Sequence, residues 1–464
     1  MKNNAMLQNN IKLIDKATKK IKSFAFDLID EGSFVETDVF AAGKSFVDCE
    51  DALGEGVVTG YATIGNKPVH FFAQNQEVLK GSFSEAHAKK ILKVIRKAVQ
   101  TGTPLISIID SNGARIGEGV AMLEAYSEVI NAINLAKENI PHIAIIKGNC
   151  VGMMASIAAM ADFVFMADSA IMSVASPQAI ASCEKDYPKL NNILGYKSIS
   201  ENSDMAEFTF KNSKELAEKI KYILTICGGE VEESEDDANR ETPALDKSYS
   251  VDLALKAICD NQKYIIANEN YAKEVVTSYG LINSISVGII ALDGSVNGGY
   301  ISANGITKAE KFIDKCSANG MPIISLVDSL GVKPSLEDEI NGLASKLAGL
   351  MTKLASCTTP MISVITGNAI GLAYSVFASK GIGFDYTLAS TDSVISPVNT
   401  AAGAAIEYAE QLKSGEDRAK LEARYLEMEQ NPFIAAKDGF IDNIIELSTM
   451  RPYIASALMM LLGI

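Results

Sequence analysis

Apolar runs and amphipathic stretches alternate along most of the chain. Six short apolar runs, typical of buried strands, begin at Pro104, Pro141, Asp162, Pro322, Pro360 and Asp385. Apolar residues at helical spacing, with lysines on the outer face, predict helices over residues 86–99, 120–137, 308–316 and 338–355. Short buried strands that alternate with helices predict an α/β fold with a largely parallel sheet covered on both faces.

The same pattern of strands and helices occurs twice along the chain. Residues 104–113 read PLISIIDSNG, and 218 residues later residues 322–331 read PIISLVDSLG. Residues 141–152 match 360–371 at an offset of 219, and the run from Asp162 matches the run from Asp385 at an offset of 223. Three matches in the same order indicate an internal repeat, so the chain is predicted to hold two tandem α/β domains.

An acidic stretch separates the two halves. Residues 228–250 read GGEVEESEDDANRETPALDKSYS, which is too poor in apolar side chains to bury a core and predicts a surface linker. We therefore expect domains over residues 1–235 and 236–464. Residues 1–50 are expected to form helices and a connecting arm, and 405–430 a charged helix.

Composition and charge exclude several classes of protein. The chain has 464 residues, 48% of them hydrophobic and 21% charged, with a net charge of −15, which argues against disorder and against nucleic-acid binding. Its seven cysteines include no CxxC pair, and its longest apolar run, residues 150–161, is too short to span a bilayer. We expect a cytoplasmic protein.

Glycines at four strand ends are the first candidate chemistry. Each half places a glycine twice where a predicted strand gives way to a helix: Gly113, Gly152, Gly331 and Gly371. Glycine there permits positive φ and a close approach of a ligand to the backbone, and the first N–H groups of a helix have no internal partner. Two such turns facing one another predict an oxyanion hole.

Other catalytic machinery is missing from the sequence. Its three histidines, His70, His87 and His142, are not spaced as metal ligands, so no metal is expected, and no GxSxG elbow or complete phosphate loop occurs. Backbone donors without a nucleophile or an obvious base suit the stabilisation of an enolate whose substrates supply the acid and the base.

The sequence resembles the carboxyltransferase subunits of biotin-dependent acyl-CoA carboxylases and decarboxylases. The segments that carry the resemblance are residues 28–36 (LIDEGSFVE), 54–91 (GEGVVTGYATIGNKPVHFFAQNQEVLKGSFSEAHAKKI) and 110–119 (DSNGARIGEG). Similar segments run from about residue 28 to residue 461. The resemblance implies two tandem crotonase-like domains built on the ββα superhelix.

The resemblance also implies a reaction and its partners. A carboxyl group would move between N1′ of biotin and the α-carbon of a short-chain acyl-CoA, with residues 1–235 binding CoA and residues 236–464 binding biotin. No A/V-M-K-M biotinylation motif occurs, so biotin would be on a separate carrier protein. Further partners would be a biotin carboxylase or membrane decarboxylase subunits, which would place the protein at the periphery of a membrane complex. A dimer or hexamer is implied, with sites formed between subunits.

The resemblance also implies which residues of this sequence form the site. Gly113, Ala114, Gly152 and Met153 would hold the thioester oxygen as it becomes an enolate, and Gly331, Val332, Gly371 and Leu372 the biotin ureido oxygen. The implied CoA contacts are Lys80, Gly81, Ser82, Lys89, Lys90 and Arg115; Ala373 and Tyr374 complete the biotin set.

Three alternatives remain open. The family motif YGGAY reads IGLAY here, and one glycine is lost from the first-domain motif too, so a scaffold that has lost turnover is one alternative. Another is the decarboxylase component of a sodium pump. The third is a biotin-independent hydratase or isomerase of the crotonase type, with Glu118 and Glu124 as acid and base candidates.

Overall fold

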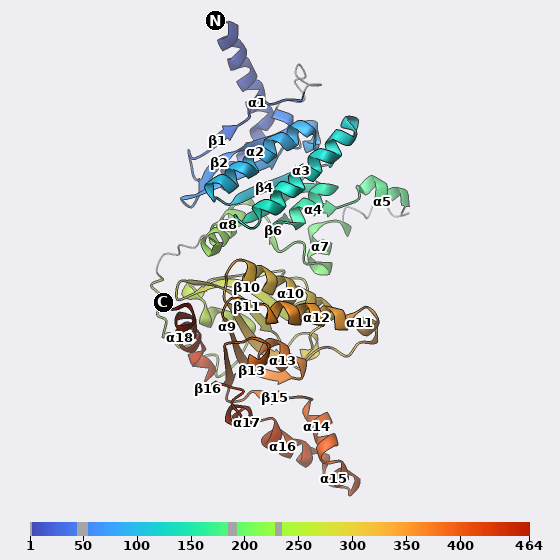
Figure 1. Ribbon diagram of the computed structural model, residues 1–464, viewed down its shortest axis with the longest axis vertical. Coiled ribbons are helices and arrows are strands. Elements are labelled where there is room, and N and C mark those ends of the chain that lie inside the picture. The colour runs from blue at the N-terminus through green and yellow to red at the C-terminus, as the bar shows by residue number, and fades with distance from the viewer. Residues whose placement is uncertain (1, 44–53, 184–192, 228–233) are drawn as a thin grey trace. The chain divides into compact units, whose positions relative to one another are not determined.

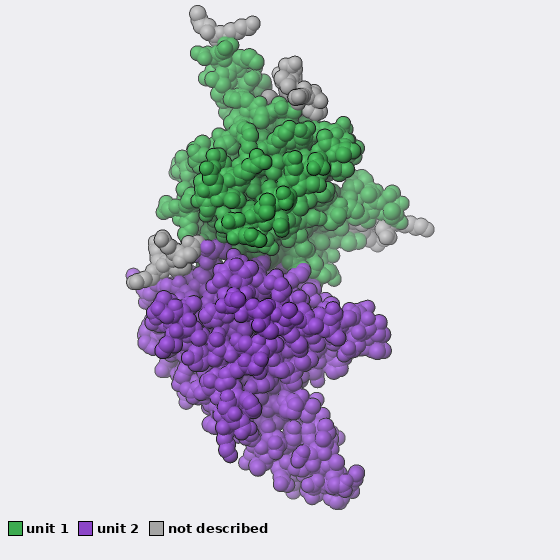
Figure 2. Space-filling view, viewed as in Figure 1, with its two compact units in different colours: residues 1–224 green, residues 225–464 purple. Residues whose placement is uncertain are grey.

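Two compact units, residues 1–224 and 225–464, make up the computed structural model, which describes residues 2–43, 54–183, 193–227 and 234–464 (Figures 1 and 2). The predicted boundary at 235/236 falls inside the second unit. Leu245 is buried in the core of that unit, and Asp236 forms an ion pair with Arg240. Residues 234–250 of the predicted linker therefore pack on the second unit, while residues 228–233 lie outside the described part.

The first unit is a mixed α/β structure. Its strands are β1 (Val35–Thr37), β2 (Val57–Ile64), β3 (Lys67–Gln74), β4 (Leu105–Ser111), β5 (His142–Val151), β6 (Phe163–Ala167), β7 (Ile171–Ser173) and β8 (Phe208–Phe210). Its helices are α1 (Lys2–Phe26), α2 (Glu85–Thr101), α3 (Val120–Ala136), α4 (Met153–Ala159), α5 (Pro177–Cys183), α7 (Tyr196–Asn202) and α8 (Ser213–Cys227), the last of which ends just beyond the unit's limit.

One eight-stranded sheet, in the order β1-β2-β3-β4-β5-β6-β8 with β7 beside β5, organises this unit. The pairs from β3 to β8 are parallel, whereas β1, β2 and β3 are antiparallel. The predicted strands at 104, 141 and 162 are β4, β5 and β6. The prediction of a largely parallel sheet is therefore confirmed, with an antiparallel hairpin, β2–β3, that it did not include.

The second unit has the same organisation. Its strands are β9 (Tyr264–Ala267), β10 (Val275–Ile282), β11 (Ile285–Leu292), β12 (Ile323–Ser329), β13 (Met361–Ile370), β14 (Tyr386–Ser390), β15 (Val394–Ser396) and β16 (Asn443–Ile445). Its helices are α9 (Val251–Ile258), α10 (Ala303–Ala318), α11 (Leu336–Ile340), α12 (Leu343–Ala355), α13 (Leu372–Phe377), α14 (Thr400–Glu407), α15 (Ala409–Lys413), α16 (Arg418–Glu429), α17 (Pro432–Lys437) and α18 (Met450–Leu462).

The β2–β3 and β10–β11 hairpins have the same register at an offset of 218, and the offset rises to 219 at β5 and β13. Tyr61 pairs with His70 across the β2–β3 hairpin, and Tyr279 pairs with Gly288 across β10–β11. The second sheet runs β16-β14-β13-β12-β11-β10-β9, with β15 beside β13. The internal repeat seen in the sequence is thus a repeat of the whole sheet and its hairpin.

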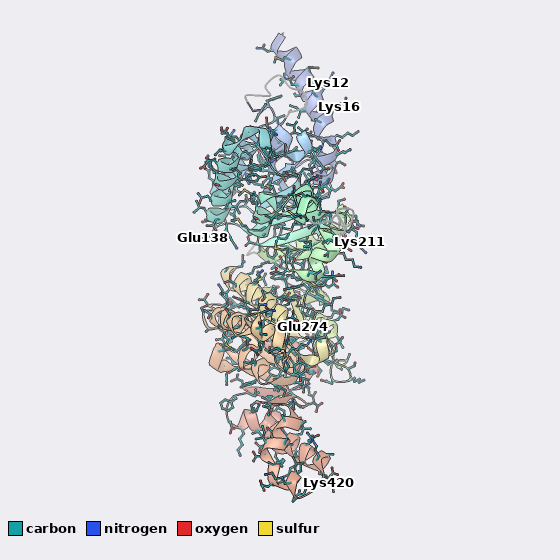
Figure 3. All side chains as sticks on the ribbon, turned by 90° about the vertical axis from the view of Figure 1, so that its right-hand side faces the viewer. Lys12, Lys16, Glu138, Lys211, Glu274 and Lys420 are labelled. Atoms are coloured by element: carbon teal, nitrogen blue, oxygen red, sulfur yellow. The ribbon has the colours of Figure 1, made fainter. Side chains whose placement is uncertain are left out.

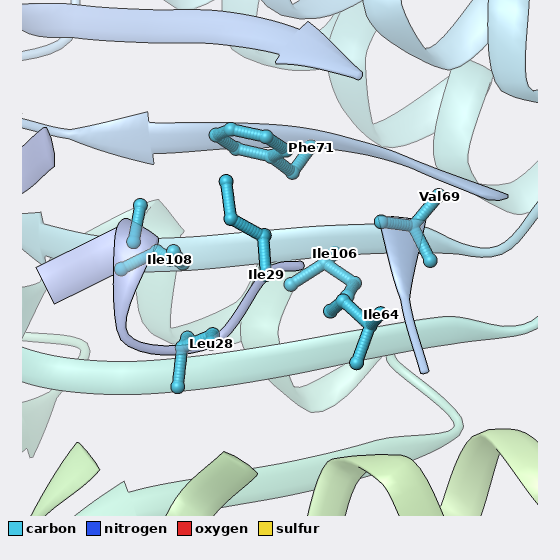
Figure 4. A pocket seen from close by; sticks show the side chains of 8 residues that line it. Leu28, Ile29, Ile64, Val69, Phe71, Ile106 and Ile108 are labelled. Carbon is cyan, nitrogen blue, oxygen red and sulfur yellow. The ribbon is translucent and has the colours of Figure 1, made fainter. Parts of the chain in front are cut away.

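Helices and apolar segments cover both faces of the first sheet. Helix α2 packs on β2 and β3, and the end of α1 lies against the opposite face. Leu28 and Ile29, just after α1, join Phe71 of β3 and Ile106 of β4 around a small apolar cavity (Figure 4). The outer surfaces carry charged side chains such as Lys12 and Lys16 of α1 (Figure 3).

Two predicted helices are broken. Residues 338–355 form α11 and α12 instead of one helix, because Gly342 adopts a φ of +84° between them. Residues 405–430 span the end of α14, α15 and α16, and Gly415 at a φ of +89° separates the last two. In both places a glycine in the left-handed region ends a helix that composition alone could not divide.

Candidate active site

Two turns lie against each other at one end of the first sheet. Gly113 follows β4 with a φ of +100°, and Gly152 precedes α4 with a φ of +76°. A Cβ on Gly152 would lie 3.9 Å from the Cα of Gly113, so the two turns are in contact, and the positive φ of both residues favours glycine. The structure therefore brings together the two glycine turns that the sequence singled out in this half.

Hydrogen bonding shows which N–H groups of these turns are available. The N–H of Gly113 donates to Ser111 Oγ at 3.2 Å, and the N–H of Gly152 donates to the carbonyl of Ser173 at 2.9 Å. Within the described residues, the N–H groups of Ala114 and Met153 donate to no protein acceptor. Of the predicted set, these two are the ones able to bind an oxygen anion.

The second unit repeats the arrangement. Gly331 N–H donates to Ser329 Oγ at 3.1 Å, and Gly371 N–H donates to the carbonyl of Ser396 at 2.8 Å. The N–H groups of Val332 and Leu372 have no acceptor in the described part of the chain. The N atom of Leu372 lies 4.0 Å from the position that a Cβ on Gly331 would take.

An aspartate, buried in the first unit and half-buried in the second, fixes the spacing of the turns. Asp110 accepts a hydrogen bond from the Asn149 N–H at 3.1 Å, and Asp328 accepts one from the Asn368 N–H at 2.8 Å. Each carboxylate fills the space where a side chain on the preceding glycine, Gly148 in the first unit, would stand. These aspartates were not among the predicted site residues, although they belong to the repeated motif Asp-Ser-x-Gly.

The predicted CoA-binding residues divide into exposed and buried groups. Lys80 is exposed at a turn with a φ of +55°, and Lys89 is exposed beside Glu85. Gly81 is buried where a Cβ would collide with the carbonyl of Asp110, and Ser82 Oγ accepts from Arg115 Nε at 3.3 Å.

Lys90 does not face the surface. Its side chain is buried, and its ammonium group donates to the carbonyls of Gly54 at 3.0 Å and Val57 at 2.5 Å. Lys308, the matching residue of the second unit, donates to the carbonyls of Asn268 and Tyr271 in the same way. The structure contradicts the prediction that Lys90 binds a phosphate, because its charge already holds the loop before β2.

Burial of these two lysines makes stability depend on pH. Burial lowers the pKa of Lys90 and of Lys308 to about 8, below the value of about 10.4 in an unfolded chain. The unfolded state therefore binds more protons between these pH values, and the free energy of unfolding rises with pH across that window. We expect Lys90→Met to remove part of the rise between pH 8 and 9.5, measured by urea unfolding. Equal slopes of the free energy of unfolding against pH in the wild type and the variant would contradict this expectation. Lys308→Met is the corresponding variant of the second unit.

Arg115 braces the first turn. Its guanidinium pairs with the buried Glu55 at 2.6 Å and lies 3.4 Å from Glu118. Glu118 also accepts from the N–H of Glu85 at 2.8 Å. Both glutamates are therefore engaged in structure around the turn, which leaves Glu118 poorly placed to act as a free acid or base.

Ala373 and Tyr374 follow the second helix start. Ala373 is fully buried, Tyr374 is half-buried, and burial raises the pKa of the Tyr374 hydroxyl. Burial lowers the pKa of His87 to about 3 and that of His142 to about 4, so both are neutral near pH 7. No cluster of three metal-ligating side chains occurs among the described residues.

Comparisons with known proteins show the family of this chain. A family model described as a carboxyl transferase domain matches residues 24–463. The propionyl-CoA carboxylase beta chain of Roseobacter denitrificans is 31% identical over 93% of this chain and 88% of its own length. Methylmalonyl-CoA decarboxylase subunit alpha of Propionigenium modestum is 31% identical over 98% of this chain and 93% of its own length.

The solved structures include a close match in fold. Transcarboxylase 12S, described as a hexamer with methylmalonyl-coenzyme A and methylmalonic acid bound, has a TM-score of 0.92 and 26% identity, covering 99% of this chain and 95% of that one. The fold implied by the resemblance, two tandem crotonase-like domains, is therefore confirmed. No helix in the described residues is both long enough and apolar enough to cross a membrane.

Proposed function

We propose, on the premise that this chain belongs to the carboxyl transferase family, that it transfers a carboxyl group between biotin on a carrier protein and the α-carbon of a short-chain acyl-CoA. The observation that carries the proposal is the pair of backbone N–H groups in each unit that donate to no acceptor among the described residues. Two such pairs suit a reaction in which an oxygen on each of two substrates gains negative charge.

In the first unit, the N–H groups of Ala114 and Met153 hold the thioester oxygen of the acyl-CoA. Their hydrogen bonds strengthen as that oxygen becomes an enolate oxygen, which lowers the barrier to removal of the α-proton. Ser111, Ser173 and Asp110 support these donors by fixing the two turns. Lys80 and Lys89, with Gly81 and Ser82, supply the surface on which the CoA phosphates bind.

In the second unit, Val332 and Leu372 hold the ureido oxygen of biotin. Biotin on its carrier supplies the carboxyl group at N1′ and, after CO2 leaves, the base that takes the α-proton. The protein then needs no side-chain base, in keeping with the engagement of Glu118 in structure. Ala373 and Tyr374 line the beginning of α13 beside these donors.

Carboxylation by a partner biotin carboxylase is one direction, and decarboxylation is the second candidate. The relative named methylmalonyl-CoA decarboxylase subunit alpha is covered over 93% of its length, which favours a decarboxylase complex as an alternative setting for the same chemistry. In that setting the partners are a biotin carrier and membrane subunits, with this chain at their periphery in the cytoplasm.

Exposed apolar residues beside each turn favour an oligomer. Ile116 and Val120 beside the first turn are 85% and 78% exposed, and Leu336 and Ile340 beside the second are 78% and 75% exposed. Such residues on two short segments next to the donors suit a surface covered by another copy. We expect the wild type to be a dimer or hexamer by light scattering, and Ile340→Glu to shift it to smaller species. An Ile340→Glu protein of unchanged mass would contradict this contact.

The test of function is carboxyl exchange with purified full-length protein. Malonyl-, methylmalonyl-, glutaconyl- and propionyl-CoA are each assayed with biotin or its carrier protein, and biotin-dependent exchange with at least one thioester is expected. Hydration of an enoyl-CoA without biotin would instead favour the crotonase-type hydratase. Binding of CoA with no exchange on any thioester would favour a scaffold that has lost turnover.

A further inference from the structure

A basic groove lies in the first unit between the β2–β3 hairpin and the middle of α2. We call it the α2 groove; Tyr61, His70, Lys93, Val94, Arg96 and Lys97 line it, and its volume is about 380 Å³. The rings of Tyr61 and His70 lie 5.8 Å apart, and Tyr61 is 44% exposed. Ligand sites in proteins commonly begin at about 300 Å³, so the groove has the size of a small-molecule site.

The α2 groove is separate from the glycine turns. His70 pairs with Leu105 at the first residue of β4, whereas the turn follows Ser111 at the last, about 20 Å further along the strand. On α2, Glu85 contacts the turn through Glu118, and Lys97 lies about 18 Å further along the helix. Of the residues proposed to bind CoA, Lys80, Gly81 and Ser82 lie beside the turn, whereas Lys89 lies on α2 one helical turn before Lys93.

In the second unit, side chains fill the equivalent place. Gly288 stands where the first unit has His70, and a Cβ there would lie 3.1 Å from Phe312, the counterpart of Val94. The Phe312 ring is buried and lies 4.9 Å from that of Tyr279. The repeat fills this space with an aromatic core, whereas the smaller Val94 leaves it open in the first unit.

The charges of the two units differ at the same place. Asp314 replaces Arg96 in the second unit and pairs with Lys353 at 2.7 Å. In the first unit Lys93 pairs with Asp38 at 2.6 Å, while Arg96 and Lys97 are exposed and form no ion pair with the described residues. Two cations without a counter-ion in a chain of net charge −15 mark a local site for an anion.

We propose that the α2 groove binds a phosphate-bearing ligand with a planar ring, of the nucleotide class. Arg96 and Lys97 provide the charge for the phosphates, and a guanidinium matches the geometry of phosphate oxygens. The Tyr61 and His70 rings provide faces against which a base stacks. The proposal is independent of the carboxyl-transfer reaction, since its residues take no part in the glycine turns.

The experiment is calorimetry on the full-length protein with ADP, adenosine and pyrophosphate. We expect ADP to bind more tightly than either fragment, and Arg96→Glu to weaken ADP at least tenfold. Lys420→Glu, an exposed helix charge of the second unit, is the matched control and leaves binding unchanged (Figure 3). Val94→Phe, which copies the residue of the second unit, closes the groove and also removes binding.

His70 gives a direct spectroscopic readout. Burial and the nearby Lys97 cation lower the pKa of His70, and Asp38, Lys93 and Arg96 are the other charged groups that line the groove. The remaining histidines are buried with pKa values lowered to about 3 and 4, so the His70 titration can be followed separately from theirs by proton NMR. Bound phosphate should raise its titration midpoint.

Three outcomes would overturn the proposal. If ADP does not bind the wild type, the proposed site does not exist. If pyrophosphate binds as tightly as ADP, the Tyr61 and His70 rings do not bind a base and the ligand is not of the nucleotide class. If Arg96→Glu raises the KM for acyl-CoA as much as it weakens ADP, the groove belongs to the substrate site. Unchanged exchange kinetics in Arg96→Glu together with lost ADP binding supports a separate site. If every thioester tested proves inactive, ADP binding to the wild type and its loss in Arg96→Glu still test the groove by themselves.

Discussion

Leu372→Pro is expected to lower carboxyl exchange by roughly a hundredfold or more while the protein stays folded. Proline lacks the N–H that we assign to the biotin ureido oxygen, and loss of one oxyanion donor typically costs about 3 kcal/mol in the transition state. Leu372 is the first residue of α13, where proline fits the helix and no internal hydrogen bond is lost. Exchange is measured as kcat, with circular dichroism and oligomer mass as checks of folding.

The control at this position keeps the N–H and changes only the side chain. Leu372→Ala should retain exchange within a fewfold, because the donor belongs to the backbone. Met153→Pro makes the corresponding deletion at the start of α4 and should cause a similar loss. Full activity in folded Leu372→Pro would remove the assignment of the second unit to biotin, whereas Met153→Pro tests the first unit by itself.

The repeat made most of the fold predictable. Strands β4, β5, β12 and β13 begin within one residue of the predicted runs, because a strand buried on both faces is a short apolar run ended by a polar turn. The β2–β3 hairpin was not predicted. Its strands are buried at most positions and lack the alternation of a half-exposed strand, although Gly65 and Asn66 at positive φ supply the turn.

The turns of the candidate site were predictable from the sequence, but the particular N–H groups that are left without an acceptor were not. Four glycines at repeated strand ends were enough to predict the turns, since glycine is needed where two backbones approach. The donors left over depend on Ser111 Oγ and on the carbonyl of Ser173, which only the folded chain brings to Gly113 and Gly152. A hydroxyl two residues before each first glycine was the available signal.

Lys89 and Lys90 show a second limit of prediction from the sequence. Lys89 and Lys90 are adjacent in sequence and were given the same role, yet helix geometry points one to the surface and the other beneath the loop at Gly54. A buried lysine is rare enough that the sequence favours exposure for both. The matching burial of Lys308 shows that this position is part of the repeated fold and not of the CoA surface.

Arg451→Met is expected to lower the free energy of unfolding of the second unit by about 3–5 kcal/mol. Arg451 on α18 is 1% exposed and pairs with Asp260 at 2.7 Å. Its Nη1 also donates to the carbonyl of Ile258 at 2.6 Å, and its Nε to that of Asp237 at 3.0 Å. The N–H groups of Asn283 and Ser284 still donate to the Asp260 carboxylate in the variant, but the buried charge loses its counter-ion, which costs far more than loss of an exposed ion pair.

The same unit offers a control in Arg240, whose side chain is 25% exposed; its guanidinium pairs with Asp236 at 2.9 Å and donates to the carbonyl of Cys259 at 3.0 Å. Water can solvate the partners that Arg240→Met leaves behind, so about 1 kcal/mol is expected there. Urea unfolding, with amide exchange in α9 and α18 to locate the effect, separates the two variants. Equal losses would mean that burial does not increase the contribution of the Arg451–Asp260 pair to the free energy of unfolding. Helix α18 would then be held mainly by the apolar contacts of Ile454 and Leu458.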